Sequence, residues 1–175
     1  MGVSVPRRGL LAGLGALAGL AACARVSTPS GGVTVPPTRP GTPAPRPVPY
    51  GADPSQYGVL HLPPEPARDV PVVVVVHGGY WRAAYGLELG TPLAVDLTNQ
   101  GLAAWNVEYR RVGAGGGWPA TFTDVAAAVD LLSGAVQEAA GGRLDLTRVV
   151  MLGHSAGGHL AVWATSRERL RDGSV

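Results

Sequence analysis

Apolar residues fall into four short runs along the later two thirds of the chain, separated by stretches rich in glycine, proline and polar residues. The runs are residues 57–62, 70–76, 102–107 and 149–152. Residues 70–76 are apolar at every position, which is typical of a central parallel strand covered on both faces. Within 57–62, His61 alternates with Leu60 and Leu62, so we expect its side chain to face solvent. The pattern predicts four strands.

Helical signals lie between the predicted strands. Thr91 and Pro92 form an N-cap followed by a first-turn proline, and Gly101 stops that helix after about residue 100. A second helix is predicted from Thr121, where Thr-Phe-Thr-Asp has the Ser/Thr-X-X-acid form of a helix start, and it ends at Gly141. Its apolar face repeats at steps of three and four and consists of Phe122, Val125, Val129, Leu132 and Val136.

A third helix is expected from residue 156 to about residue 169, directly after the last apolar run. Strands and helices therefore alternate along the chain. This order predicts an α/β fold with a mostly parallel sheet, helices on both faces and right-handed crossovers. In such folds the reactive groups lie at the C-terminal ends of the strands.

The first 23 residues have the form of an export signal. Arg7 and Arg8 precede an apolar run of about 13 residues, too short to cross a bilayer as a helix. The two arginines suit a twin-arginine signal or an ordinary basic start. Leu20-Ala21-Ala22-Cys23 resembles the bacterial lipoprotein box, which implies that Cys23 is lipidated. The mature protein would then be exported and anchored by its lipid to the outer face of a bacterial cell membrane.

Residues 24–49 are dominated by serine, threonine, glycine and proline. Such a segment buries too little apolar area to offset its ordering entropy, so we expect a disordered, extended linker between the signal and a domain at 50–175. Without Arg7 and Arg8, the remaining 12 basic residues balance 12 acidic ones. A neutral mature protein offers no electrostatic basis for binding nucleic acid.

No cofactor or metal is expected from the sequence. Cys23 is the only cysteine, which excludes an internal disulfide and a cysteine-based metal site. The glycine-rich stretch 113–117 is not followed by the Gly-Lys-Ser/Thr of a phosphate-binding loop.

The candidate chemistry is centred on Ser155. It stands in Gly153-His154-Ser155-Ala156-Gly157, a Gly-X-Ser-X-Gly sequence between an apolar run and a predicted helix, which is the form of a nucleophile elbow. A Cβ at position 153 or 157 would collide with the neighbouring strand or helix. The amide of Ala156, in the first helical turn, would face an oxyanion formed at the serine.

A second motif, His77-Gly78-Gly79-Tyr80-Trp81, follows the strand at 70–76. A His-Gly-Gly turn in this place matches the loop that supplies the other oxyanion-hole amide in lipases and esterases. Tyr109, Arg110 and Asp124 suit a buried polar network, and Trp81 and Trp118 suit either an acyl pocket or core packing.

These motifs together resemble the α/β-hydrolases of the esterase/lipase branch, including carboxylesterases and kynurenine-formamidase-like enzymes, from about residue 50 onward. The residues that carry the resemblance are His77-Gly78-Gly79-Tyr80-Trp81, Glu108-Tyr109-Arg110-Arg111, Gly116-Gly117-Trp118-Pro119 with Asp124, and Gly153-His154-Ser155-Ala156-Gly157-Gly158. The resemblance implies the N-terminal part of an α/β-hydrolase fold. It also implies that Ser155 is the nucleophile for a small-molecule ester or formamide, and that the amides of Gly78, Gly79 and Ala156 form the oxyanion hole.

The triad acid and histidine of this fold are missing from the sequence. They follow the nucleophile in the order serine, acid, histidine, but Asp172 is the only aspartate after Ser155 and no histidine follows His159. His154 and His159 flank the nucleophile without the geometry of a base. We therefore predict little or no turnover, a C-terminally truncated lipoprotein hydrolase whose later strands are absent, and an unpaired apolar edge at 148–152.

Two other functions stay open. The His-Gly-Gly-Tyr-Trp form looks like the formamidase subgroup, which favours an arylformamidase-type amide hydrolase. The missing triad partners favour a non-catalytic lipoprotein domain or pseudoenzyme fragment.

Overall fold

A computed structural model describes residues 34–167 of the chain. The predicted signal at 1–23, its Cys23 and the first part of the predicted linker lie outside the described residues. The strands are β1 (Arg46–Pro49), β2 (Tyr57–His61), β3 (Val70–Val76), β4 (Ala103–Val107) and β5 (Leu144–Gly153). All four strands predicted from the apolar runs are present, and β1 is additional.

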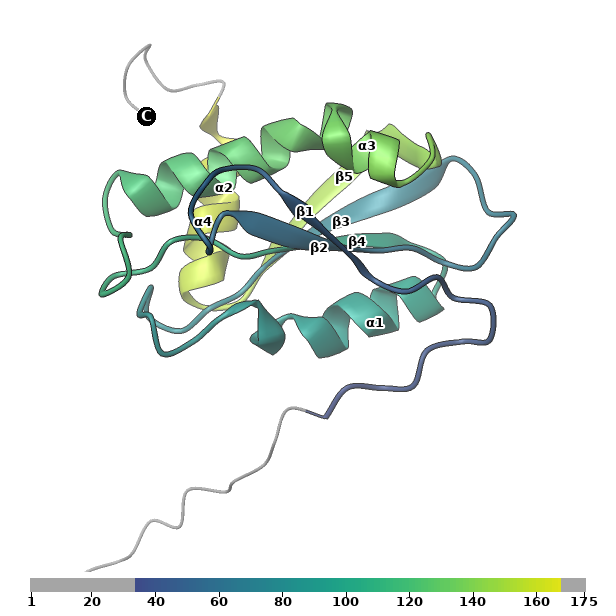
Figure 1. Cartoon of the computed structure of the whole chain (residues 1–175), viewed down its shortest axis with the longest axis horizontal. Coiled ribbons are helices and arrows are strands. Elements are labelled where there is room, and N and C mark those ends of the chain that lie inside the picture. The colour runs from purple at the N-terminus through teal and green to yellow at the C-terminus, as the bar shows by residue number, and fades with distance from the viewer. Residues whose placement is uncertain (1–33, 168–175) are drawn as a thin grey trace, which may run out of the picture. The chain divides into compact units, whose positions relative to one another are not determined.

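The strands form one sheet in the order β1-β2-β4-β3-β5 (Figure 1). Strands β4, β3 and β5 run parallel, whereas β1 and β2 pair antiparallel with their neighbours, so the sheet is mixed. The chain passes from β3 to β4 on one side and returns to β5 on the other. The C-terminal ends of β3 and β5 thus lie side by side at a topological switch point, where α/β folds place their ligands.

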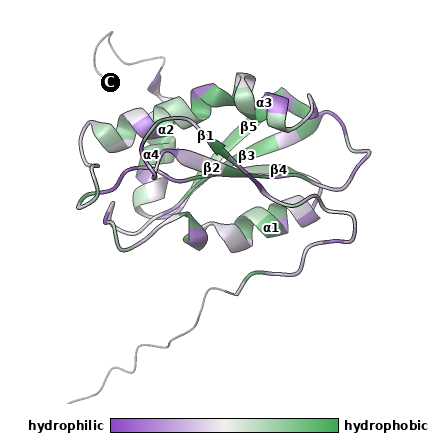
Figure 2. Ribbon diagram, in the orientation of Figure 1, coloured by the Kyte–Doolittle hydropathy of each residue, from purple (hydrophilic) through white to green (hydrophobic). Residues whose placement is uncertain are grey.

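Helices cover both faces of the sheet. Helix α1 (Thr91–Asn99) lies on one face, and α2 (Ala120–Asp130), α3 (Ala135–Ala139) and α4 (Ala156–Thr165) lie on the other (Figure 1). The alternate valines of β3 divide between two apolar clusters, with Val72, Val74 and Val76 beneath α2–α4 and Val73 and Val75 beneath α1. The central strands are accordingly hydrophobic along their length (Figure 2). None of the helices within 34–167 has the length and hydrophobicity needed to span a bilayer.

The expectation of a disordered linker up to residue 49 is wrong for its last part. Strand β1 lies within that range and pairs with β2 from Arg46 to Pro49. Further upstream, the Asn99 side chain accepts from the amide of Arg39 and donates to the carbonyl of Pro37. Prolines alternate in β1, so they take the positions of this edge strand that need no donor toward β2.

His61 does not face solvent, contrary to the expectation from alternation. Only 5% of the residue is exposed, because it pairs with Ala104, whose side chain belongs to the cluster under α1. Strand β2 is thus covered on both faces at its end. Burial lowers the pKa of His61 below its ordinary value.

The predicted helix starts are displaced by one residue and use different contacts. Helix α1 has Gly90 as its N-cap, and Thr91 donates its hydroxyl to the carbonyl of Leu87. Helix α2 starts at Ala120 with no side-chain cap. The expected continuous helix up to Gly141 is interrupted by a 3-10 turn (Leu131–Ser133) before α3, although its apolar face packs on the core as predicted.

Strand β5 forms one edge of the sheet in the described chain, pairing with β3 alone. On the face toward α1, Val150 is 61% and Leu152 is 37% exposed. The unpaired apolar edge expected from the sequence is therefore present within residues 34–167.

Candidate functional site

Ser155 sits at a sharp bend between β5 and α4. Its φ of 53° and ψ of −120° lie outside the regions that L-residues favour, and α4 begins at the next residue, Ala156. The residue is exposed while Ala156 is buried. A serine is held in such a strained conformation only when the structure around it enforces the bend.

Glycines make this bend sterically possible. A Cβ on Gly153 would strike the backbone of Gly157, and a Cβ on Gly157 would strike the carbonyl oxygens of Val76 and His77. The first turn of α4 therefore packs directly on the backbone at the end of β3. The collisions predicted from the Gly-X-Ser-X-Gly motif are confirmed.

The turn that follows β3 lies against the same bend. A Cβ built on Gly78 would come within 3.3 Å of the Ser155 Cβ and 2.6 Å of the His154 carbonyl oxygen. The backbone then takes positive φ values at three consecutive residues, 112° at Gly79, 55° at Tyr80 and 58° at Trp81. The two sequence motifs thus meet, and both contain strained backbone of the kind that functional sites concentrate.

A buried polar network of His77, Glu108 and Tyr109 supports this turn. His77 lies between two partners, with Nε2 2.9 Å from Oε1 of Glu108 and Nδ1 2.8 Å from the carbonyl oxygen of Gly78. Its ring stacks on Tyr109 with centroids 4.3 Å apart and planes 6° apart. The hydroxyl of Tyr109 donates to the His77 carbonyl oxygen at 2.8 Å.

The carboxylate of Glu108 is surrounded by donors. Besides His77, it accepts from the amides of Tyr109 and Leu87, and Arg111 lies 3.5 Å away. Burial acts to raise the pKa of Glu108, but the hydrogen bond and charge of His77, together with the two amides, lower it overall. In the sequence Glu108 stands within the Glu-Tyr-Arg-Arg motif, and no role is predicted for it there.

A second network ties the following loop to α2. Asp124, 1% exposed, accepts from the amide, Nε and Nη2 of Arg110 at 2.7–2.9 Å and from Nε2 of Gln56 at 2.8 Å. The predicted polar contact between Arg110 and Asp124 is present, whereas the Tyr109 side chain belongs to the network of His77. Asp124 is held by Arg110 and is not free to orient a base at Ser155.

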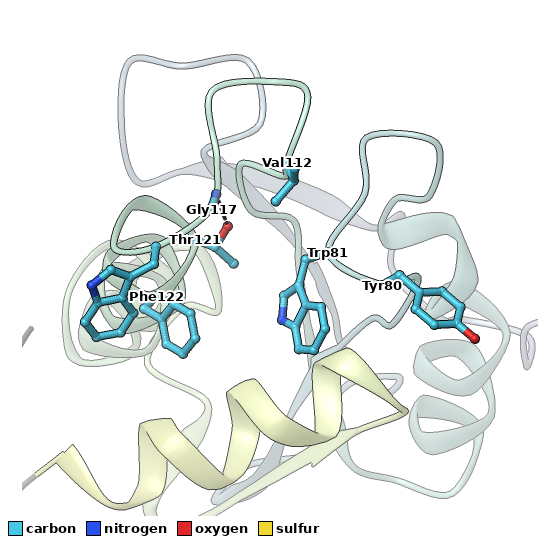
Figure 3. Close-up of a pocket in the computed structure, with 7 residues that line it drawn as sticks. Tyr80, Trp81, Val112, Gly117, Thr121 and Phe122 are labelled. Atoms are coloured by element: carbon cyan, nitrogen blue, oxygen red, sulfur yellow. Dashed lines mark hydrogen bonds between the residues drawn. The ribbon is translucent and has the colours of Figure 1, made fainter.

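An aromatic pocket of about 180 Å³ opens beside the N-terminal half of α4. Figure 3 shows the rings of Trp81 and Phe122 facing each other across it, with α4 running along one side. Both rings meet His159, one helical turn after Ser155, edge to face with centroids 5.7 Å apart. Trp118 also lines the pocket. The sequence suggested Trp81 and Trp118 as pocket residues, whereas it assigned Phe122 to the core face alone.

The three histidines near Ser155 lie in different surroundings. His77 is buried and paired, His159 packs against aromatic rings, and Nδ1 of His154 lies beside Gly78. Within residues 34–167, no histidine is hydrogen-bonded to the Ser155 side chain. The same residues contain no cluster of three or more His, Cys, Asp or Glu side chains placed to hold a metal ion.

Comparison with known proteins places this geometry in context. Residues 59–172 match the sequence model of the BD-FAE family. Over 121 residues the chain is 31% identical to a kynurenine formamidase of Danio rerio, covering 69% of this chain and 38% of that protein.

Solved esterase structures share the fold. A bacterial heroin esterase is 28% identical with a TM-score of 0.61, covering 74% of this chain and 41% of that one. An inhibited esterase B from Lactobacillus rhamnosis is 27% identical with a TM-score of 0.65, covering 78% and 43%. The chain therefore spans about two fifths of the length of these relatives. The predicted fold, part of an α/β-hydrolase, is confirmed, with a sheet that is mixed and not mostly parallel.

Proposed function

The chain belongs to the BD-FAE family of α/β-hydrolases, and on this premise we propose that it carries a serine-hydrolase site for carboxylic esters with Ser155 as the nucleophile. The observation that carries the proposal is the strained bend at Ser155, φ 53°, against which the Gly78 turn packs. A nucleophile elbow of this kind holds the serine hydroxyl clear of the strand and beside backbone amides.

In the proposed reaction, the Ser155 oxygen bonds to the carbonyl carbon of the ester, and the carbonyl electrons move onto its oxygen. The amides of Gly78, Gly79 and Ala156 stabilise that oxyanion. When the carbonyl re-forms, the ester C–O bond breaks and the alcohol leaves with the proton that a general base took from the serine. Water then hydrolyses the acyl-enzyme by the same steps.

A general base for Ser155 is not found among residues 34–167, since no histidine there is hydrogen-bonded to the Ser155 side chain and His77 and His159 have other partners. Removing the base costs roughly 10⁶-fold in a well-studied serine protease, whereas an oxyanion hole and binding leave about 10³- to 10⁴-fold over water. The proposal is therefore that this chain by itself turns esters over very slowly, while its serine still reacts with a strong electrophile.

A fluorophosphonate probe tests the nucleophile directly, because the serine oxygen bonds to phosphorus as fluoride leaves and the serine proton passes to water. We expect the folded chain to be labelled, Ser155→Ala to abolish labelling, and the control Ser166→Ala to leave it unchanged. Ser166 lies just past the end of α4 and donates to the Val162 carbonyl. Folded protein that is not labelled would favour the non-catalytic domain instead.

A second candidate activity is hydrolysis of an N-formyl aryl amide. It is favoured by the kynurenine formamidase relative together with the aromatic pocket of Trp81 and Phe122, which is suited to an aryl group. Residual hydrolysis of N-formylkynurenine and of a short p-nitrophenyl ester should be compared, with Ser155→Ala as the blank. Hydrolysis of the formamide alone would replace the ester proposal.

The proposed site is carried by an exported lipoprotein. The support is the Leu-Ala-Ala-Cys sequence ending at Cys23 after a basic, apolar segment. Expression in a bacterial host with a labelled fatty acid should give a lipidated, membrane-bound product, and Cys23→Ser should remove the label. A product that stays unlabelled with Cys23 intact would contradict lipid anchoring.

A further inference from the structure

Two carbonyl groups in the 77–79 turn are each held by a side chain of the network below it. The hydroxyl of Tyr109 donates to the carbonyl of His77, and Nδ1 of His77 lies 2.8 Å from the carbonyl of Gly78. These two carbonyls belong to the peptide groups that carry the amides of Gly78 and Gly79. Those amides are the proposed oxyanion donors.

Anchoring a carbonyl also aims the amide that follows it. A trans peptide group is planar, and its C=O and N–H bonds point in opposite directions. With the carbonyls of His77 and Gly78 held on the network side, the amides of Gly78 and Gly79 must face the opposite side. The Tyr109 hydroxyl and the His77 ring therefore set the direction of both donors.

Both ring nitrogens of His77 face hydrogen-bond acceptors. The Gly78 carbonyl next to Nδ1 accepts only. The Glu108 carboxylate next to Nε2 receives the amides of Tyr109 and Leu87, with Arg111 3.5 Å away, so it too is placed as an ionised acceptor. In a neutral imidazole one ring nitrogen carries a lone pair, which would face the oxygen of Gly78 or Glu108 with no hydrogen between them. An imidazolium donates a hydrogen bond from both nitrogens.

We propose that His77 is a buried imidazolium paired with Glu108, and that His77 and Tyr109 together act as positioning residues for the oxyanion amides. We call the two contacts that hold the His77 and Gly78 carbonyls the clamp. The clamp is rigid because the rings of His77 and Tyr109 stack and the His77 side chain is fully buried. The inference rests on the proposed function for its catalytic consequence, but the protonation of His77 can be tested without it.

Among the charged groups around the pair, Arg111 favours an ionised Glu108, and the like charge of Glu88 opposes it. Arg111 approaches from the loop after β4, and Glu88 and Glu108 both lie beside Gly86. Tyr57 and Tyr109 are neutral, because burial, followed by the charge of Glu108, raises the pKa of each phenol. The lowered pKa of Glu108 agrees with a carboxylate that stays ionised beside His77.

Nitrogen-detected NMR of the isotope-labelled full chain tests the protonation state. We expect two ring N–H signals for His77 at neutral pH, one for each acceptor that its ring nitrogens face. Glu108→Gln should reduce them to one at neutral pH, whereas the control Glu88→Gln should retain both. A single ring N–H in the unmodified chain would overturn the imidazolium.

The clamp is tested by the rate at which a fluorophosphonate labels Ser155. Tyr109→Phe keeps the stacked ring and removes the hydroxyl, so we expect labelling to slow about tenfold, part of the 10²- to 10³-fold that loss of a whole oxyanion donor costs. Tyr50→Phe is the matched control, because its hydroxyl also donates to a backbone carbonyl, that of Glu108. Equal rates in the two variants would overturn the clamp. If the unmodified chain is not labelled, the proposed function fails, while the NMR result still decides the state of His77.

Discussion

Replacing Gly157 by alanine should destabilise the fold through a single added methyl group. The Cβ would lie 2.5 Å from the His77 carbonyl oxygen and closer still to that of Val76, whereas ordinary contact begins at 3.4 Å. Both obstacles are backbone atoms at the end of the central strand β3, so neither can rotate away. The helix or the strand must move by about 1 Å, from the difference between those distances.

The expected cost lies near the upper end of the usual range. Overpacking a well-packed interior costs about 1–3 kcal/mol, and alanine returns about 1 kcal/mol of helix propensity relative to glycine. We therefore expect a net loss of about 2 kcal/mol in the free energy of unfolding. Labelling of Ser155 should slow as well, because moving α4 displaces the Ala156 amide.

Gly158→Ala is the matched control in the same helical turn. Its Cβ would meet the Gly153 carbonyl oxygen at 3.1 Å, a contact that a shift of a few tenths of an ångström relieves. The propensity gain is the same, so the difference between the variants isolates the collision. Urea unfolding followed by circular dichroism should separate their midpoints by about 1.5 M for a slope of about 2 kcal/mol per M. Coincident midpoints would refute the steric account of the glycine.

Three further outcomes follow from the described contacts. Asp124→Asn should lower the free energy of unfolding, measured in urea, by about 2–3 kcal/mol. This is less than the roughly 3–5 kcal/mol lost when a fully buried ion pair is broken, because the Arg110 side chain is 26% exposed. Asp130→Asn is the control and should change little, because the Asp130 side chain is 61% exposed. Because the pKa of His61 is lowered by burial, the unfolded chain binds a proton that the folded chain does not. Stability should then be full above about pH 6.5 and fall as the pH drops below it, and His61→Gln should flatten that dependence; an equally steep curve in the variant would exclude His61 as its source. Val150→Lys on the exposed edge of β5 should reduce self-association in sedimentation without lowering the unfolding midpoint, and unchanged association would show that this edge does not mediate it.

The elbow could be predicted from the sequence because its geometry depends on neighbours along the chain. An apolar run, two glycines around a serine and a following helix specify the bend locally, and the collisions at Gly153 and Gly157 are a direct result. The strand at Val70–Val76 was equally clear, since every residue in it is apolar.

Features that depend on pairing in space were missed for a physical reason. Alternation along β2 suggested that His61 is solvated, but α1 covers that position. The proline-rich composition of 24–49 suggested disorder, but an open edge of β2 recruits Arg46–Pro49 as a strand. In both cases the decisive contact comes from a segment distant in the sequence.

The role of Glu108 shows the same limit of local reasoning at the site. His77 and Glu108 each follow a parallel strand, and the register that pairs Val76 with Val107 brings the two side chains together. Thirty-one positions separate them in the sequence. The residues next to His77 or Glu108 in the sequence do not indicate the contact. The available signal was that each follows the end of a predicted parallel strand, because neighbouring parallel strands end at the same edge of the sheet.

The parts of the proposed site that act on the carbonyl are all assembled by β3, β4, β5 and α4. The bend at Ser155, the Gly78 turn and the network of His77 with Tyr109 depend on packing among these elements alone. Proton transfer from the serine depends on none of them. Because the two functions use separate contacts, reactivity of the serine toward a strong electrophile should survive in this chain while turnover of an ester remains slow. The same separation predicts that variants of the network change the labelling rate, while ester turnover stays slow because residues 34–167 supply no base.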